Sequence, residues 1–147
     1  ISQHRILKTF LKKYQMMELD QFTLDEANAL VPWLQEKLKV LDRNREKYVA
    51  LQERFHEISH DPSRDGSTDD PELIQTTANV KELAAQIEDG VQEILDRGII
   101  VRDVSTGLVD FPSQRDGREV FLCWIGGEEK IEFWHETDRG FDYREPI

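Results

Sequence analysis

Cysteine is almost absent from this chain: Cys123 is the only one among 147 residues. A single thiol excludes an intramolecular disulfide and fits a reducing compartment. Long apolar runs are also missing, since no stretch approaches the roughly 18 consecutive apolar residues that a membrane-spanning helix needs, and no signal peptide is visible. We therefore expect no membrane span and predict a cytoplasmic location.

Basic residues are in the minority. The chain has 19 Lys and Arg against 30 Asp and Glu, which gives a formal net charge of -11. A surface this acidic is repelled by a phosphate backbone, so we expect no nucleic-acid partner. The charged fraction of 33% exceeds the usual quarter and indicates much exposed helix surface, whereas 38% hydrophobic residues exclude a disordered chain. The length fits one domain.

The amino-terminal segment differs from the rest. Residues 1–15 carry four basic side chains and no acidic one, with apolar residues at helical spacing: Ile6, Leu7, Phe10, Leu11 and Tyr14. This pattern is typical of a basic amphipathic helix that touches a membrane surface. The alternative, which we favour, is that Met16 or Met17 is the natural start and the preceding residues are not native. We treat residues 1–21 as an extension and 22–147 as a single domain.

A capping box predicts where the first long helix begins. The Thr23 hydroxyl can accept a hydrogen bond from a backbone N–H, and Glu26 follows three residues later. Apolar residues then recur mostly in steps of three and four: Ala27, Val31, Leu34, Leu38, Leu41, Tyr48, Phe55 and Ile58. Pro32 interrupts the pattern. Because proline removes a backbone hydrogen bond and clashes with the preceding turn, we expect a kink there.

A polar turn at residues 60–70 separates this helix from a second one. Asp70 is placed as its N-cap, Pro71 as its first residue, and Gly98 just beyond its end. The apolar positions between them keep a repeat of four and three: Leu73, Thr77, Val80, Ala84, Ile87, Val91 and Ile94. Two facing heptad seams joined by a short turn predict an antiparallel coiled-coil hairpin.

The register of this hairpin follows by counting outward from the turn. It places Trp33 beside Arg97, where the second helix gives way to the next element. Gly90 lies inside the second helix and is expected to mark a close helix approach. Residues 24–31 extend beyond the second helix, so we expect them to cover one face of whatever follows.

From residue 98 onward the apolar period changes to two, which is typical of strands. Four short strands are predicted, at residues 99–103, 107–111, 119–125 and 130–135. The fold class is therefore α+β: a helical hairpin over residues 22–97, with its first helix kinked at Pro32, followed by a four-stranded antiparallel sheet over residues 98–147.

The last two strands have a predicted register. A turn at residues 126–129 sets apolar partners on one face of the sheet: Trp124 with Ile131, Leu122 with Phe133, and Val120 with His135. On the other face, the same register pairs Phe121 with Trp134 and Cys123 with Glu132.

Short motifs of this chain resemble a known family. FTLDEAN at residues 22–28 and GLVDFP at 107–112 are followed by GREV at 117–120, LCW at 122–124, WH at 134–135 and GF at 140–141. This series resembles the bacterial family called domain of unknown function 2203. The resemblance implies no activity, because none is assigned to the family. Family members often read GFAGR where this chain has GFDYR at residues 140–144, and often have an acidic residue at the position of Lys130.

His56, Glu57 and His60 match the HExxH motif of zinc proteases. On a helix, however, both histidines lie roughly 120–160° from the apolar seam and point into solvent near the hairpin tip. We interpret the match as coincidental and predict neither a metal site nor a cofactor there.

A cluster of polar and aromatic residues in the predicted sheet is the stronger candidate. Its members are Asp110, Arg115, Arg118, Trp124, Trp134, His135 and Arg144, with Cys123 and Arg139 beside them. Arginines in an acidic chain can assemble a forked donor site for a carboxylate or phosphate, walled by tryptophan rings. The alternative, which we favour, is that these residues pack the sheet, with His135 a hydrogen-bonded core residue on the face of Val120.

A nucleophilic role for Cys123 requires a nearby base and a lowered pKa. The carboxylate of Glu132, its predicted neighbour, would instead raise the pKa of the thiol. We therefore predict a buried structural cysteine.

The favoured hypothesis for function is a non-catalytic interaction module. Val40, Val49 and Leu51 lie off the strict seam and widen the apolar stripe of the hairpin. A homodimer forming a four-helix arrangement, or a partner protein, would cover that stripe. The alternative is a small-anion or metal-binding protein, or an enzyme, that uses the cluster in the sheet.

Overall fold

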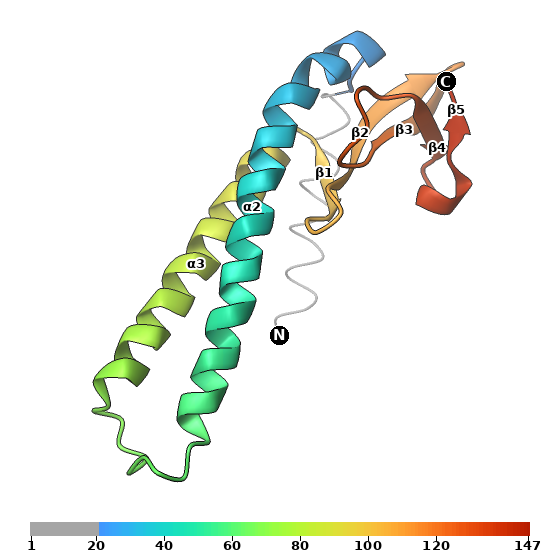
Figure 1. The fold of residues 1–147 in the computed structure, drawn as a ribbon. Helices are drawn as coiled ribbons and strands as arrows, with labels where there is room; N and C mark the ends of the chain where they lie inside the picture. Colours follow the sequence, from blue (N-terminus) through green and yellow to red (C-terminus); the bar gives the residue numbers. More distant parts are fainter. Residues whose placement is uncertain (1–20) are drawn as a thin grey trace, which may run out of the picture.

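The computed structural model describes residues 21–147. Two long helices, α2 (Leu24–Ser59) and α3 (Pro71–Asp96), form a hairpin that projects from a small sheet (Figure 1). The predicted α+β class and helical hairpin are confirmed. The predicted basic amphipathic extension covers residues 1–21. All of these except Gln21 lie outside the part of the chain that the structure describes. No helix among residues 21–147 combines the length and the apolar character that crossing a membrane requires.

Helix α2 begins where the capping box predicts. Thr23 has extended backbone angles, and its hydroxyl accepts a hydrogen bond of 3.1 Å from the N–H of Glu26. This bond satisfies one of the free N–H groups at the helix start. Pro32 lies inside α2, and the helix continues through it without interruption. The kink at Pro32 stays a prediction.

The hairpin tip and the start of α3 are held by side chains. Asp70 accepts hydrogen bonds from the N–H groups of Glu72 (2.9 Å) and Leu73 (3.4 Å), and Pro71 opens the helix as predicted. Arg64 forms an ion pair with Asp70 at 2.6 Å and another with Glu72. These contacts tie the turn at residues 60–70 to the first turn of α3.

The two helices pack most closely near the sheet. Arg97 stacks on the ring of Trp33 at 3.9 Å, which confirms the predicted hairpin register at this end. Gly90 faces Leu41 so closely that a Cβ at Gly90 would collide with the Leu41 side chain. The expected close approach at Gly90 is therefore present, and it depends on the missing side chain.

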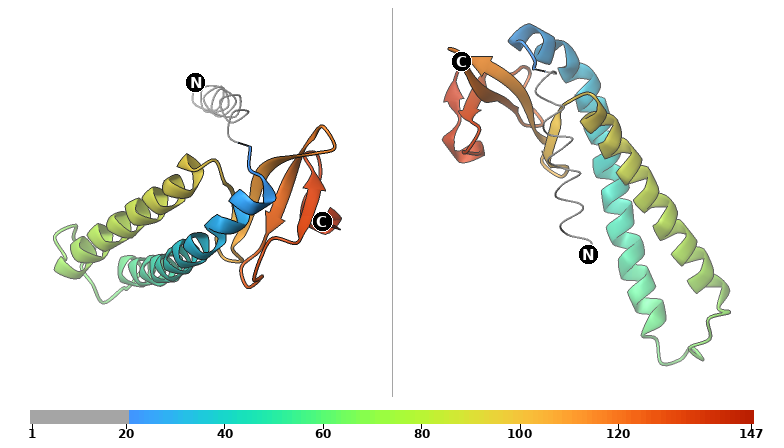
Figure 2. Two further views of the ribbon diagram at one scale, coloured as in Figure 1. Left: turned by 90° about the horizontal axis from the view of Figure 1, so that it is seen from above. Right: turned by 180° about the vertical axis from the view of Figure 1, so that it is seen from behind.

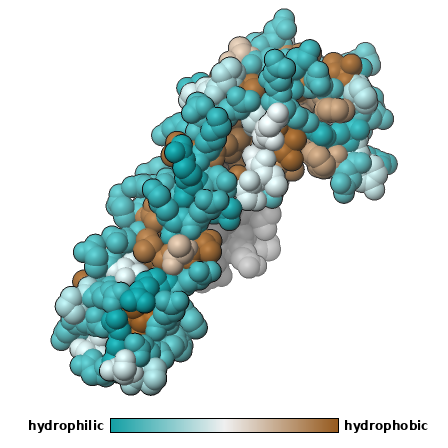
Figure 3. Space-filling view, viewed as in Figure 1, coloured by the Kyte–Doolittle hydropathy of each residue, from teal (hydrophilic) through white to brown (hydrophobic). Residues whose placement is uncertain are grey.

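The outer half of the hairpin is less well covered. Between residues 42 and 93, only Ile58 and Thr76 of the two helices are buried, and the other seam residues are half-buried or exposed. Apolar patches remain visible along the hairpin surface (Figure 3). In a pair of helices, each helix covers only the middle of its partner's apolar stripe, and the edges of the stripe stay exposed. The exposure therefore follows from the two-helix architecture.

The sheet has five antiparallel strands rather than the four predicted, in the order β1-β2-β3-β4-β5. They are β1 (Ile100–Asp103), β2 (Leu108–Arg115), β3 (Arg118–Trp124), β4 (Phe133–Glu136) and β5 (Glu145–Pro146). A 3₁₀ turn, η2 (Phe141–Tyr143), precedes β5. Strand β2 continues through Pro112 to Arg115, whereas we expected Pro112 to lie just beyond its end. The two-residue β5 has no apolar alternation from which it could be predicted.

The predicted register of β3 and β4 is wrong by one residue. The structure pairs Phe121 with His135, Leu122 with Trp134 and Cys123 with Phe133. The reason is the connection at residues 125–132, which is longer than a hairpin turn. There the N–H of Ile131 donates to the Asn28 side chain of α2 at 2.8 Å instead of entering the sheet ladder. A shift of one residue moves every β4 side chain to the other face.

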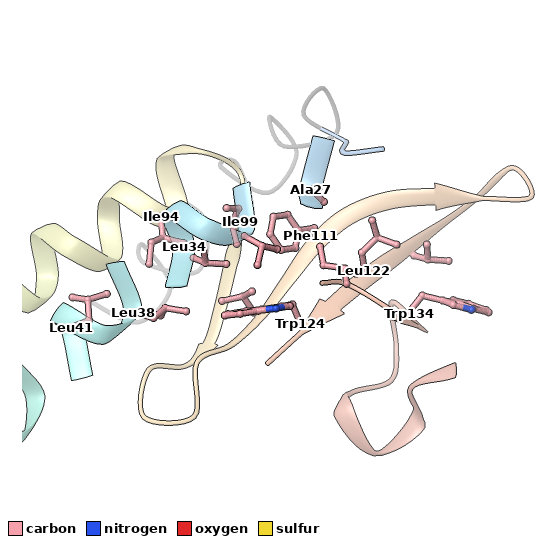
Figure 4. Packing of buried hydrophobic residues seen from close by; sticks show 14 residues of the cluster. Ala27, Leu34, Leu38, Leu41, Ile94, Ile99, Phe111, Leu122, Trp124 and Trp134 are labelled. Atoms are coloured by element: carbon pink, nitrogen blue, oxygen red, sulfur yellow. The ribbon is translucent and has the colours of Figure 1, made fainter. Parts of the chain in front are cut away.

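The core lies between one face of the sheet and the first half of α2 (Figure 2). Ala27, Val31 and Leu34 of α2 pack with Phe111, Leu122 and Trp124 of the sheet (Figure 4). Backbone and side-chain bonds reinforce the contact: the N–H of Phe22 donates to the carbonyl of Pro112 at 2.8 Å, and the Ser113 hydroxyl donates to the carbonyl of Phe22 at 2.6 Å. The expectation that residues 24–31 cover the sheet is confirmed.

Candidate functional site

Three chemically reactive side chains meet on the sheet face that points away from α2. Asp110 in β2 pairs directly with Cys123 in β3, and His135 lies on the neighbouring strand β4. Their sequence neighbours Phe111, Leu122 and Trp134 fill the core, and successive residues of a strand point to opposite faces. One oxygen of Asp110, the sulfur of Cys123 and one ring nitrogen of His135 all lie within 4.8 Å of one another.

Hydrogen bonds fix the orientation of Asp110 and His135. Nε2 of His135 lies 2.9 Å from Oδ1 of Asp110, and Nδ1 lies 2.8 Å from the backbone carbonyl oxygen of Glu136. The other carboxylate oxygen, Oδ2, accepts from Nε of Arg102 at 2.8 Å. A carbonyl and a carboxylate both accept hydrogen bonds, so each ring nitrogen of His135 lies against an oxygen acceptor.

The cluster is closed to solvent. The side chains of Asp110 and His135 are 4% and 2% exposed, and Cys123 is fully buried. Arg144 lies over the rings of Phe133 (4.3 Å) and Phe141 (4.1 Å). The Arg144 side chain, from the residue between η2 and β5, therefore covers Phe133 of β4, whereas β5 itself is the edge strand of the sheet.

Arg102 and Arg144 are the charged groups nearest this cluster. Arg102 is held by Asp110, and Arg144 donates to Oε1 of Glu128 at 2.8 Å. The Arg144 side chain is only 14% exposed. Both guanidinium groups thus have a carboxylate partner, as a charge close to a buried site requires.

The Cys123 thiol is poorly suited to nucleophilic chemistry. Burial and, next, the negative charge of Asp110 raise the pKa of Cys123 to about 12, although Arg144 acts in the opposite direction. The direction agrees with the sequence prediction, but the carboxylate responsible is Asp110 rather than Glu132. Both ring nitrogens of His135 already contact oxygen acceptors, so the imidazole has no free position from which to take the thiol proton.

We expect Cys123 to react very slowly with iodoacetamide in the folded protein at pH 8. A thiol with a pKa near 12 has roughly a thousandth of the thiolate fraction of an ordinary cysteine at that pH, and burial slows access further. Mass spectrometry after timed labelling measures the rate. Protein unfolded in guanidinium chloride is the control and should be labelled completely. Rapid labelling of the folded chain would contradict the buried, protonated thiol.

The other residues of the predicted cluster are not brought to this site. Trp124 and Trp134 lie in the core on the opposite face of the sheet. Arg115 stacks on Trp134 at 5.0 Å, and Arg118 pairs with Glu136 at 2.9 Å. Arg139 stacks on Tyr143 at 4.7 Å. Among the described residues, these arginines therefore do not converge on a common anion.

The HExxH residues lie far along the hairpin from the sheet. His56 and His60 are exposed, as predicted, and their ring centroids lie 4.1 Å apart. Nδ1 of His60 contacts the carbonyl oxygen of His56 at 2.9 Å. Within residues 21–147, the group of three possible metal ligands is Asp110, Cys123 and His135, and it does not include this motif.

Arg102 is a site residue that we did not predict, whereas Cys123 was named with the predicted cluster but interpreted as a structural cysteine. The usable signal was Asp110, an acidic residue inside the apolar strand that begins LVDFP. A buried carboxylate needs a cationic or hydrogen-bonding partner, and Arg102 faces it across the β1–β2 hairpin.

The fold and the site together define a small α+β protein in which a helical hairpin is joined to a sheet with a buried Asp, Cys and His cluster. The family described as "Uncharacterized conserved protein (DUF2203)" matches residues 21–147. The chain belongs to this family, as the motifs in the sequence suggested. No curated protein and no solved structure matches it.

Proposed function

We propose that the protein is a self-associating module and that two copies pack their hairpins into a four-helix arrangement. The observation that carries this proposal is the apolar surface left on the hairpin: Val40, Phe55 and Ile74 are 48%, 40% and 55% exposed. A second hairpin would cover seam residues that two helices alone leave half-buried and would give them coiled-coil packing.

One face of the hairpin fits this role best. Val40 and Leu51 are eleven residues apart on α2, which is close to three full turns, so they lie on the same face. Leu51 lines a shallow depression of about 470 Å³ between the helices together with Ala50 and Leu83. We predicted that Val49 belongs to the same stripe, but it lines a different depression with Gln52 and His56. The contact face therefore contains Val40 and Leu51 without Val49.

The charges of the two helices support pairing between copies. Helix α3 has one basic residue, Lys81, against six acidic ones, whereas α2 has seven acidic residues against six basic ones: Lys37, Lys39, Arg43, Arg45, Lys47 and Arg54. A symmetric dimer that places α2 of one copy against α3 of the other gives the acidic α3 the more basic of the two helices as its neighbour. The alternative pairing, with α3 of one copy against α3 of the other, would bring two acidic helices together.

We propose a non-catalytic role and a cytoplasmic location for this dimer. The free, buried Cys123 supports a reducing compartment. The high pKa of its thiol and the engaged nitrogens of His135 support a structural role for the sheet rather than a reaction.

The double substitution Val40→Glu/Leu51→Glu is expected to convert the dimer into a monomer, because it places four carboxylates in a symmetric contact. Sedimentation velocity or light scattering measures the mass, and circular dichroism checks the helix content. The single substitution Val40→Glu, compared with Val49→Glu, is the matched control: each adds one carboxylate at a valine of similar exposure (48% and 41%), and only Val49→Glu, on the other face, should leave the dimer intact. A wild-type chain that is already monomeric at high micromolar concentration would overturn the proposal.

A further inference from the structure

We propose that Asp110, Cys123 and His135 form a binding site for one divalent transition-metal ion, with zinc as the best fit. The site would use Oδ1, Sγ and Nε2 as ligand atoms. It lies on the outer face of the sheet, away from the hairpin, so it is independent of the proposed self-association.

The three ligand atoms are already gathered. They come from three adjacent strands and all lie within 4.8 Å of one another. Bonds of about 2.0–2.3 Å to a tetrahedral zinc ion place neighbouring ligand atoms about 3.5 Å apart. Oδ1 and Nε2 at 2.9 Å would move apart slightly to admit the ion. The sulfur needs to approach by about 1.3 Å at most, which rotation of the Cys123 side chain can supply.

The surrounding bonds orient two of the ligands as metal sites require. The bond from Nδ1–H of His135 to the Glu136 carbonyl directs the Nε2 lone pair toward Asp110 and Cys123. Metal-binding histidines commonly donate their other ring N–H in this way. Arg102 bonds to Oδ2 of Asp110, so an ion bound by Oδ1 would replace only the contact between Oδ1 and Nε2 of His135.

The charge of the buried cluster does not oppose binding. The Asp110 carboxylate and a Cys123 thiolate together supply two negative charges, which match a divalent ion. The proton of the Cys123 thiol leaves for solvent when the ion binds. The positive charges of Arg102 and Arg144 are balanced as before, because their bonds to carboxylates remain.

The ligand set selects the kind of ion. A thiolate and an imidazole favour zinc and its neighbours in the transition series over magnesium or calcium, which prefer oxygen ligands. Three protein ligands leave one position of a tetrahedral ion for a small exogenous ligand such as water.

The test uses the full chain with His56→Gln/His60→Gln, which removes the exposed histidine pair as a competing site. After removal of metal with a chelator, Co²⁺ is titrated into the protein. We expect one ion per chain, a thiolate-to-cobalt charge-transfer band, and loss of that band when Zn²⁺ is added. Cys123→Ser should abolish the band, and His135→Gln should weaken binding at least tenfold.

Two results would overturn the proposal: no charge-transfer band in the His56→Gln/His60→Gln protein, or binding that disappears with those two histidines. If Cys123→Ser is poorly folded, thermal unfolding provides a second measurement that still tests the proposal. Zn²⁺ should raise the melting temperature of the His56→Gln/His60→Gln protein because it binds the folded state, and should leave that of a Cys123→Ala version unchanged. An equal rise in both proteins would count against a thiolate ligand.

Discussion

Replacing Asp110 by alanine is expected to lower the free energy of unfolding by about 3–5 kcal/mol, the usual cost of breaking a buried ion pair by removing one partner. The carboxylate bonds to both His135 and Arg102, and its side chain is 4% exposed. Without it, Nε2 of His135 faces an apolar surface with no acceptor. Urea unfolding followed by circular dichroism measures the change.

Two further substitutions make this result specific. Asp110→Asn keeps the volume and one acceptor oxygen but removes the charge, so its loss should be smaller than that of Asp110→Ala. Arg118→Ala removes the exposed pair with Glu136, in which the arginine side chain is 60% exposed. That change should cost less than about 1 kcal/mol, because exposed ion pairs contribute little. Equal effects from Asp110→Ala and Arg118→Ala would show that the buried network does not support the fold.

Trp124→Ala should have an effect of similar size, about 3–5 kcal/mol, as is typical when a large buried aromatic side chain is removed. Trp124 is 1% exposed and belongs to the same buried core cluster as Leu34 and Phe111 (Figure 4). Its ring N–H also donates to the carbonyl of Glu128 at 3.0 Å. The substitution therefore opens a cavity and removes the shorter of the two hydrogen bonds to the Glu128 carbonyl, which also accepts from Nε2 of Gln35 at 3.4 Å.

Trp124→Phe separates these two contributions. It retains most of the apolar volume and loses the hydrogen bond, so its cost should be about 1–3 kcal/mol. Thermal unfolding of the three proteins at one concentration and pH provides the comparison. A Trp124→Phe protein as unstable as Trp124→Ala would assign most of the effect to the hydrogen bond rather than to packing.

The helical hairpin was predictable because its signals are local. Thr23 and Asp70 mark helix starts through hydrogen bonds to N–H groups two or three residues away, and Gly98 ends α3 with a positive φ of 84°. Such contacts depend on neighbouring residues alone. The apolar seam was also largely correct, although Ala84 is exposed and Thr76 is buried instead.

The sheet was less predictable because its register depends on residues far away in the sequence. The bond from the Ile131 N–H to Asn28 spans 103 positions, and no local pattern indicates it. The bond makes the connection between β3 and β4 longer than the glycine pair at residues 126–127 suggests. The predicted register therefore placed His135 on the core face with Val120, whereas in the structure His135 lies on the outer face with Phe121.

The site was missed for the same reason. Asp110 and His135 were both candidates, but the shifted register placed His135 on the core face and Cys123 opposite Glu132. With the correct register, alternation along β2, β3 and β4 is enough to bring Asp110, Cys123 and His135 to one face. All three residues can be identified in the sequence, and only the relative position of the strands could not be predicted from it.

The contact between Leu41 and Gly90 fixes how the two helices align along their length. Similar apolar residues repeated along two helices allow neighbouring alignments one turn, about 5.4 Å, apart. Only Gly90 leaves room for the Leu41 side chain at this depth, so the other alignments would bring Leu41 against a bulkier residue. Because β1 begins shortly after α3 ends, the same contact contributes to the height at which the sheet meets α2. The missing side chain thus acts together with the direct contacts between α2 and the sheet in positioning the outer-face cluster relative to the hairpin.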